Sequence, residues 1–178
     1  DMTDDLGKAM AHWEGLGLTF EAVYTGFMGN ARQMALASDF IRAVRTPGML
    51  AVVDPVMGDH GKLYRTYTPE MCHAMKTLAG AADVIVPNLT EAALLLDVPY
   101  GSLAPTEDGF RRTTEALSLG GRRSVVLTGV SLTEGKTGAA CVDRESGEVS
   151  FVQTDFISRP FHGTGDLFAS VLTGALVQ

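Results

Sequence analysis

Short apolar runs alternate along the chain with segments in which apolar and polar residues recur at helical spacing. Residues 49–53 are continuously apolar and include β-branched residues, a pattern typical of a strand covered on both faces. Similar short runs predict further strands over residues 22–25, 83–86 and 124–127. Around these strands we expect helices over residues 3–14, 31–45, 68–79, 90–96 and 107–119.

Several element boundaries carry their own signals. Thr3 and Thr68 stand where helix N-caps are expected, and Pro69 occupies the first helical position after Thr68. The segment between Asp54 and Thr68 is rich in turn-forming residues and is expected to form a loop. Two strand-like segments near the end of the chain, separated by a polar, glycine-containing turn, predict an antiparallel hairpin over residues 137–142 and 149–153.

Strand and helix alternate along most of the chain. This order predicts an α/β fold with a mainly parallel central sheet, helices on both faces and right-handed crossovers. Ligands of such sheets bind at the carboxyl ends of the strands, so residues scattered in the sequence can converge there. This convergence is the main argument for an enzyme. The predicted strand-end residues are Gly26, Phe27, Asp54, Asn88, Glu91 and Thr128.

The segment 162–170 combines a glycine-bracketed turn, a carboxylate and the start of an apolar helix. A buried helix is predicted to begin near Thr164, because the apolar residues that follow recur on one helical face. The free N–H groups of its first turn and the positive end of the helix dipole favour an anion. Gly163 and Gly165 have no Cβ to keep a phosphate away from the backbone. We therefore predict an anion-binding corner at the start of this helix.

Asp166 lies in the first turn of that predicted helix. Its carboxylate can accept the proton of an attacking hydroxyl group, while the N–H groups hold the charge that develops on a transferred phosphoryl group. A kinase needs this combination. The simpler alternative, an ordinary acidic helix start after a glycine turn, stays open on this motif alone. His162, just before the turn, is interpreted as a packing or hydrogen-bonding residue rather than a ligand.

Two further strand ends carry acidic residues. Asp54 and Asp59 lie in the loop after the apolar run 49–53, and carboxylate oxygens suit Mg²⁺, which keeps several waters and bridges to substrate phosphates. A surface loop in which Asp54 caps a turn explains them as well. At the next strand end Glu91 can hold a metal-bound water, and Asn88 can orient a phosphate or the loop. Taken alone, the latter pair favours a simple N-cap with an acidic first turn.

Composition narrows the class of protein. The chain has 178 residues, of which 46% are hydrophobic, which suits the core of one domain and excludes disordered and fibrous classes. A formal net charge of -7 and a pI near 5.0 argue against a nucleic-acid or anionic-membrane surface. The sequence shows no membrane-spanning run and no signal peptide. Cys72 and Cys141 lack metal-ligand spacing and are interpreted as reduced core residues of a cytoplasmic protein.

Four motifs together resemble those of the pyridoxal/pyridoxamine kinases of the ribokinase superfamily, and the similarity runs over essentially the whole chain. The motifs are Asp54-Pro-Val-Met-Gly-Asp59, Gly61-Lys-Leu-Tyr64, Pro87-Asn-Leu-Thr-Glu91 and Gly163-Thr-Gly-Asp-Leu-Phe168. The resemblance implies a three-layer α/β/α ribokinase-like fold with a mainly parallel central sheet. It implies a single kinase domain over residues 1–178, lacking the N-terminal portion and the C-terminal end of the family. The implied reaction is ATP-dependent phosphorylation of the 5′-hydroxymethyl group of vitamin B6 compounds.

The same resemblance implies roles for individual residues. Asp166 would be the base that activates the 5′-hydroxymethyl group. The anion hole for the γ-phosphate would consist of Gly163, Thr164 and Gly165. Mg²⁺ and the ATP phosphates would be organised by Asp54, Asp59, Asn88 and Glu91, with Asp54, Asp59 and Glu91 as the metal ligands. Thr128 and Phe161 would contact the nucleotide, Phe161 at the adenine, and Phe27 and Tyr64 would lie toward the substrate.

The implied cofactors are ATP and Mg²⁺, and the need for a monovalent cation such as K⁺ is open. The implied partners are a B6 compound and ATP, in a cytoplasmic homodimer that binds neither nucleic acid nor membrane. The chain departs from the family at Phe27, where tyrosine is common, so one hydroxyl contact near the substrate is expected to be missing. Ring contacts and dimer contacts that the N-terminal portion supplies in the family cannot be assigned.

Three alternatives stay open. A hydroxymethylpyrimidine kinase of the same superfamily phosphorylates a similar aromatic alcohol, but that group typically has cysteine at the position of Asp166. A P-loop protein is disfavoured, because residues 129–137 have five residues between the glycines and a predicted strand follows where a helix should. A non-catalytic nucleotide-binding or dimerising fragment is the third alternative.

Overall fold

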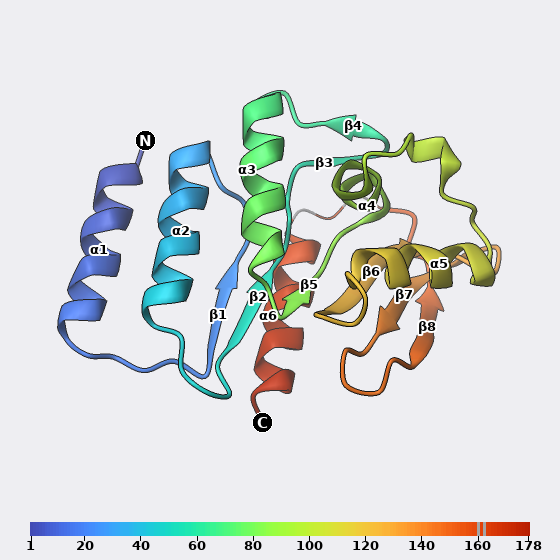
Figure 1. Ribbon diagram of the computed structural model, residues 1–178. Coiled ribbons are helices and arrows are strands. Elements are labelled where there is room, and N and C mark those ends of the chain that lie inside the picture. Colours follow the sequence, from blue (N-terminus) through green and yellow to red (C-terminus); the bar gives the residue numbers. More distant parts are fainter. Residues whose placement is uncertain (160, 162) are drawn as a thin grey trace.

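A six-stranded sheet lies at the centre of the computed structural model, which describes residues 1–159, 161 and 163–178 (Figure 1). The four strands that come first in this sheet run parallel, and the last two add antiparallel to its edge. This confirms the predicted α/β class, the mainly parallel sheet and the hairpin. In spatial order the strands are β1 (Ala22–Thr25), β2 (Leu50–Val53), β5 (Val84–Ile85), β6 (Ser124–Val130), β7 (Lys136–Val142) and β8 (Val149–Asp155).

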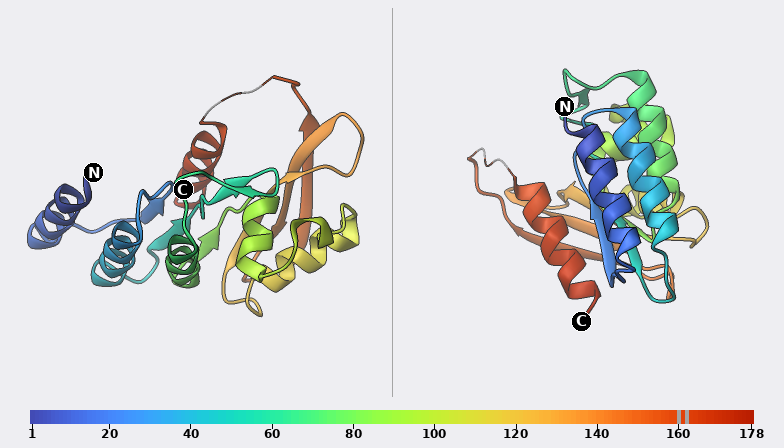
Figure 2. Two further views of the ribbon diagram at one scale, coloured as in Figure 1. Left: turned by 90° about the horizontal axis from the view of Figure 1, so that it is seen from above. Right: turned by 90° about the vertical axis from the view of Figure 1, so that its left-hand side faces the viewer.

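The helices cover the two faces of the sheet unequally. α2 to α5 lie on one side, α1 packs beside α2 at the edge, and α6 alone lies on the other side (Figure 2). A short 3₁₀ helix, η1, spans Tyr100–Ser102. The helices are α1 (Thr3–Gly15), α2 (Ala31–Ala43), α3 (Pro69–Gly80), α4 (Leu89–Leu96), α5 (Glu107–Leu117) and α6 (Thr164–Leu176).

Two apolar clusters hold these layers together. The larger one lies between the sheet and α2 to α5 and includes fully buried Phe110, Met34 and Leu127. The smaller one lies beneath α6 and includes Val52 and Ala169. Burial of apolar surface is the main force that stabilises both clusters. As a result, the carboxyl ends of the parallel strands lie between α6 on one face of the sheet and α3 and α4 on the other.

The prediction that the last helix is buried is wrong for the described chain. Ala169 is the buried residue of α6, whereas Leu167 and Val171 are 66% and 65% exposed. One side of the helix packs on the sheet, and no described element covers the other side (Figure 2). The apolar spacing identified the helix correctly but could not show which other segments would cover it.

Of the two predicted helix N-caps, Thr68 is confirmed and Thr3 is wrong. Thr68 is the N-cap of α3, and its side chain accepts a hydrogen bond from the Met71 amide at 3.2 Å. Thr3 is not an N-cap, because it already lies in the helix, and Met2 precedes it without a side-chain cap. The Thr3 amide instead donates to the Asp1 carboxylate at 3.0 Å. Asp1, two residues earlier, therefore takes over the capping role.

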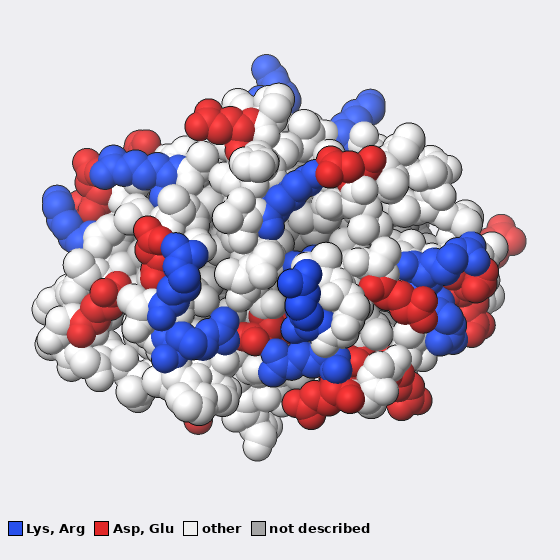
Figure 3. Space-filling view, viewed as in Figure 1, with Lys and Arg blue, Asp and Glu red and all other residues white. Residues whose placement is uncertain are grey.

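The segment predicted as a loop after Asp54 contains a small hairpin of β3 (Gly58–Asp59) and β4 (Lys62–Leu63). A Cβ at position 58 would lie 2.2 Å from the Lys62 carbonyl oxygen, so only glycine allows this pairing. Basic and acidic side chains lie next to one another on the face that Figure 3 shows. Arg32 of α2 forms an ion pair with Asp4 of α1 at 2.9 Å. No helix among the described residues is long and apolar enough to cross a membrane.

Candidate active site

The carboxyl ends of the parallel strands meet at one edge of the sheet. The Asp54 amide, just after β2, donates to the carbonyl of Thr25 at the end of β1, at 2.9 Å. Farther along the edge, Asn88 pairs with Thr128 in a parallel bridge, and the Thr128 amide donates to the Pro87 carbonyl at 2.9 Å. The strand-end residues predicted to converge therefore lie along this common edge.

α6 begins at the same edge, on the opposite face of the sheet from α3 (Figure 1). Gly163 is its N-cap, with a φ of 79° in the left-handed region that favours glycine. The first N–H groups of a helix have no acceptor within the helix and can bind an anion. The predicted anion-binding residues, Gly163, Thr164 and Gly165, are thus placed where β1 and β2 end. His162, which precedes them, lies outside the described residues.

The start of α6 brings two carboxylates together. A Cβ at position 165 would lie 3.8 Å from Oδ2 of Asp54, and a Cβ at position 26 would lie 3.4 Å from Oδ1 of Asp166. Both positions are glycine, so backbone and carboxylates approach closely. Asp166 therefore lies over the end of β1, and Asp54 lies beside the first turn of α6.

The electrostatics of this corner are unusual. Asp54 is buried, and its burial, followed by the negative charge of Asp166, raises the pKa of its carboxyl group to about 7. Neither carboxylate forms a salt bridge within the described part of the chain. Two neighbouring carboxylates without a cation favour the binding of a positive ion or of a proton.

Asn88 and Glu91 form a capping box at the start of α4. The Asn88 side chain accepts hydrogen bonds from the amides of Thr90 and Glu91, at 2.8 and 3.0 Å. The buried Glu91 carboxylate accepts from the amides of Asn88, at 2.8 Å, and Met57, at 3.1 Å. Asn88 also donates from Nδ2 to the Gly58 carbonyl at 2.9 Å. The simple capping arrangement considered for this pair is present, and it ties the β3–β4 hairpin to α4.

The buried position of Glu91 has an electrostatic consequence. Burial raises the pKa of its carboxyl group to about 8, although the hydrogen bond from the Asn88 amide opposes this rise, and the charge of Asp54 adds to it. Each carboxylate oxygen of Glu91 accepts a backbone hydrogen bond, and these bonds fix the side chain against the β3–β4 hairpin and the start of α4. Its geometry suits positioning of the loop better than direct contact with a metal.

The predicted magnesium ligands fit only in part. The described residues contain no group of three or more His, Cys, Asp or Glu side chains that could hold a metal. Asp59 is half exposed and faces His60, with Oδ2 and Nε2 3.4 Å apart. Mg²⁺ is usually held by one or two carboxylates together with substrate phosphates, and Asp54 meets that requirement. The set of Asp54, Asp59 and Glu91 as metal ligands stays a prediction.

The residues predicted to contact substrate and adenine are exposed. Phe27 is 55% exposed, and its ring meets the buried ring of Tyr67 edge-on at 6.4 Å. Tyr64 follows the β3–β4 hairpin, and burial, then Glu91, raises the pKa of its hydroxyl group. Phe161 is 57% exposed near the start of α6. Their contacts with ligands stay predictions.

Tyr24 is the residue of this corner that the sequence interpretation missed. It lies two positions before Gly26, and its hydroxyl group is buried without a hydrogen-bond partner among the described residues. A tyrosine in a short apolar strand is usually a packing residue, so the sequence pattern alone did not distinguish Tyr24 from a core residue. The period of two along a strand could have shown that residues 24 and 26 share one side.

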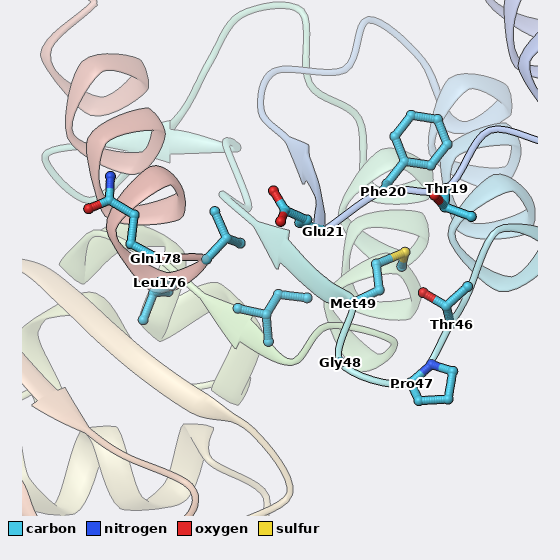
Figure 4. A pocket seen from close by; sticks show the side chains of 11 residues that line it. Thr19, Phe20, Glu21, Thr46, Pro47, Gly48, Met49, Leu176 and Gln178 are labelled. Carbon is cyan, nitrogen blue, oxygen red and sulfur yellow. The ribbon is translucent and has the colours of Figure 1, made fainter.

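A separate surface pocket of about 500 Å³ lies at the opposite edge of the sheet. It is lined on one side by residues just before β1 and β2, such as Glu21 and Met49, and on the other by Leu176 and Gln178 at the end of α6 (Figure 4). None of the predicted site residues lines it. Because ligands of parallel sheets bind at the carboxyl ends of strands, this pocket is not the candidate active site.

Comparison with known proteins agrees with the fold and with the family resemblance. A profile of the phosphomethylpyrimidine kinase family matches residues 12–178. A Bacteroides thetaiotaomicron protein assigned to the phosphomethylpyrimidine kinases, solved in a crystal form with pyridoxal, is 39% identical with a TM-score of 0.92, covering 100% of this chain and 63% of that one. The ADP complex of Bacillus subtilis pyridoxal kinase is 26% identical with a TM-score of 0.75, covering 96% of this chain and 60% of that one.

Among curated relatives, the pyridoxal kinase of Arabidopsis thaliana is 30% identical over 163 residues, which cover 88% of this chain and 51% of the relative. The fold and these matches define the class, an α/β protein of the ribokinase superfamily. The chain belongs to the family described as phosphomethylpyrimidine kinase, and pyridoxal kinases are among the relatives that it matches. It spans about half the length of the curated relatives it matches.

Proposed function

We propose that the protein containing this chain transfers the γ-phosphoryl group of ATP to the 5′-hydroxymethyl group of pyridoxal, pyridoxamine or pyridoxine. The observation that carries the proposal is the placement of Asp166 in the first turn of α6, over the end of β1 and near Asp54. A base thus lies beside a helix N-terminus that can hold a phosphate. The pyridoxal in one relative and the ADP in another support the choice of the two substrates.

In the proposed reaction Asp166 accepts the proton of the substrate hydroxyl group as its oxygen attacks the γ-phosphorus. The N–H groups of residues 163–165 hold the charge that develops on the transferred group. Asp54 would hold Mg²⁺, which supplies charge neutralisation at the ATP phosphates when it is bound. Asn88 and Glu91 keep the β3–β4 hairpin and α4 in place around the nucleotide.

Phosphorylation of hydroxymethylpyrimidine is the second candidate function. The name of the matching family profile favours it, and so does the assignment of the Bacteroides thetaiotaomicron relative. Both substrates are aromatic rings that carry a primary alcohol, so the same base and anion site would serve either reaction. Asp166 stands where the hydroxymethylpyrimidine kinases typically have cysteine, and this residue favours the B6 reaction.

Competition between the two alcohols tests the proposal. The polypeptide of residues 1–178 and the longer protein that contains it are each incubated with ATP, Mg²⁺, pyridoxal and hydroxymethylpyrimidine, and both products are quantified. We expect pyridoxal 5′-phosphate as the main product. Product from residues 1–178 alone would show that further segments are dispensable, whereas phosphorylation of neither alcohol by the longer protein would refute the kinase proposal. The homodimer, the monovalent cation and the cytoplasmic location stay predictions.

A further inference from the structure

The hydroxyl group of Tyr24 is a buried polar group that the proposed reaction does not use. Tyr24 is the third residue of β1, and its ring packs with the apolar cluster beneath α6. The hydroxyl oxygen is buried and has no hydrogen-bond partner among the described residues. A buried hydroxyl group without a partner is energetically costly, so it calls for a partner that forms in another state of the site.

Two carboxylates lie around this hydroxyl group. A Cβ at position 26 would lie 3.1 Å from the Tyr24 hydroxyl oxygen and 3.4 Å from Oδ1 of Asp166. Residue 26 is glycine, so its side chain does not separate the phenol from the carboxylate. Burial, followed by the charges of Asp54 and Asp166, raises the pKa of Tyr24 to about 12. The phenol is therefore a proton donor at neutral pH.

We propose that Tyr24 is a positioning residue, whose hydroxyl group donates a hydrogen bond to one oxygen of Asp166 and leaves the other oxygen facing the acceptor alcohol. This inference rests on the proposed function, because it takes Asp166 as the base. Hydrogen bonds of an active site are often long in the empty protein and shorten when the substrate binds. Asp166 is the favoured acceptor, because a Cβ on Gly26 would lie close both to the Tyr24 hydroxyl oxygen, at 3.1 Å, and to Oδ1 of Asp166, at 3.4 Å. Asp54 lies instead beside Gly165.

The contact itself is tested without any turnover. Protein labelled with ¹³C at the ζ carbon of tyrosine gives resonances that respond to hydrogen bonding of each phenol, and loss of a resonance in Tyr24→Phe assigns that of Tyr24. Spectra are recorded with a non-hydrolysable ATP analogue, Mg²⁺ and pyridoxal. We expect Asp166→Asn to move the Tyr24 resonance while leaving that of Tyr100 in place. No movement in Asp166→Asn, or movement only in Asp54→Asn, would overturn the proposal.

Kinetics test the positioning role. In the full-length protein Tyr24→Phe is expected to lower kcat for pyridoxal about tenfold, the loss of one hydrogen bond, with KM for ATP and pyridoxal nearly unchanged. The control Tyr100→Phe removes a hydroxyl group from a half-exposed ring in η1 and should leave kcat unchanged. An unchanged kcat in Tyr24→Phe would refute the role. Absence of any kinase activity in the wild type would instead refute the proposed function, and the spectra would still decide the contact.

Discussion

At the scale of single residues, the corner between β1, β2 and α6 contains two carboxylates that no described cationic side chain neutralises. Asp54 is buried, Asp166 is its neighbour, and neither forms a salt bridge with another described residue. A site of this kind is costly for an empty protein and favourable for one that binds a cation together with phosphates. This argues that the corner serves a ligand rather than stability.

Replacement of Asp166 by asparagine tests the base directly. The amide keeps the shape of the side chain but cannot accept the substrate proton, so kcat of the full-length protein should fall by roughly 10²- to 10⁴-fold. ATP binding, measured by calorimetry, should change little. Asp108→Asn is the matched control, because Asp108 is an exposed residue of α5 that pairs with Arg112, and its loss should leave kcat unaltered. Turnover of Asp166→Asn at the wild-type rate would remove Asp166 from the mechanism.

At the scale of elements, α3 and α5 end against a shared buried side chain. Arg123 is buried, and its guanidinium group donates from Nε to the Leu117 carbonyl at 2.7 Å and from Nη1 to the Ala79 carbonyl. Burial lowers the pKa of this guanidinium group to about 10, which leaves it charged at neutral pH. A positive charge at helix C-termini stabilises both the free carbonyl groups and the helix dipole.

Arg123→Met should therefore destabilise the protein. The substitution removes the donor to the Leu117 carbonyl and one donor to the Ala79 carbonyl, which still accepts from the Ala82 amide at 3.2 Å. The free energy of unfolding is therefore expected to fall by about 1–3 kcal/mol. Urea unfolding followed by circular dichroism measures the change. The adjacent, exposed Arg122 provides the control, since Arg122→Met should alter stability by less than about 0.5 kcal/mol. Equal effects of both substitutions would contradict the capping role.

Asp83, just before β5, joins three other segments. Its carboxylate accepts hydrogen bonds from the Ala51 amide at 2.8 Å, from Arg144 at 2.7 Å and from Arg45. Burial favours a higher pKa, but these hydrogen bonds outweigh it and lower the pKa of Asp83. A lowered pKa in the folded state means that the carboxylate stabilises the fold above its unfolded pKa of about 4 and loses this effect as the pH falls.

Asp83→Asn should thus change the pH dependence of stability. At pH 7 the variant should be less stable than the wild type by about 1–2 kcal/mol, and the difference should shrink as the pH falls below about 4. Thermal unfolding from pH 3 to pH 8 measures both. Asp5→Asn, at an exposed position of α1, should follow the wild-type curve. A difference that does not change with pH would show that Asp83 acts through packing alone.

The elements also show how far the sequence could be interpreted. Strands and helices whose pattern is local, such as β2 and α3, were predicted close to their observed bounds. The β3–β4 hairpin was missed because two-residue strands have no period, and its pairing depends on the close approach of Gly58 to Lys62. The site motifs could be located at strand ends, but Tyr24 could not, because its environment comes from α6, far along the chain.

At the scale of the whole molecule, the two faces of the sheet differ in cover. The face opposite α2 to α5 carries α6 and the side chains that point the same way from β7 and β8. Val152 of β8 pairs with Ala139, a member of the cluster beneath α6, so it lies on that face, where it is 66% exposed. Val171 on the outer side of α6 is 65% exposed. Exposed apolar surface of this extent promotes association.

The polypeptide of residues 1–178 should therefore self-associate and bind a hydrophobic dye more strongly than the longer protein does. The relatives have about twice its length, and we expect the additional segments to cover part of this face. Light scattering over a range of concentrations, together with dye fluorescence, measures the difference. Val152→Lys combined with Val171→Lys should lower both signals, because two charges interrupt the apolar surface. Glu107→Gln combined with Glu115→Gln, at exposed positions of α5 on the opposite side, changes the net charge by the same amount and provides the matched control. If those substitutions lowered the signals equally, association would depend on net charge and not on this face.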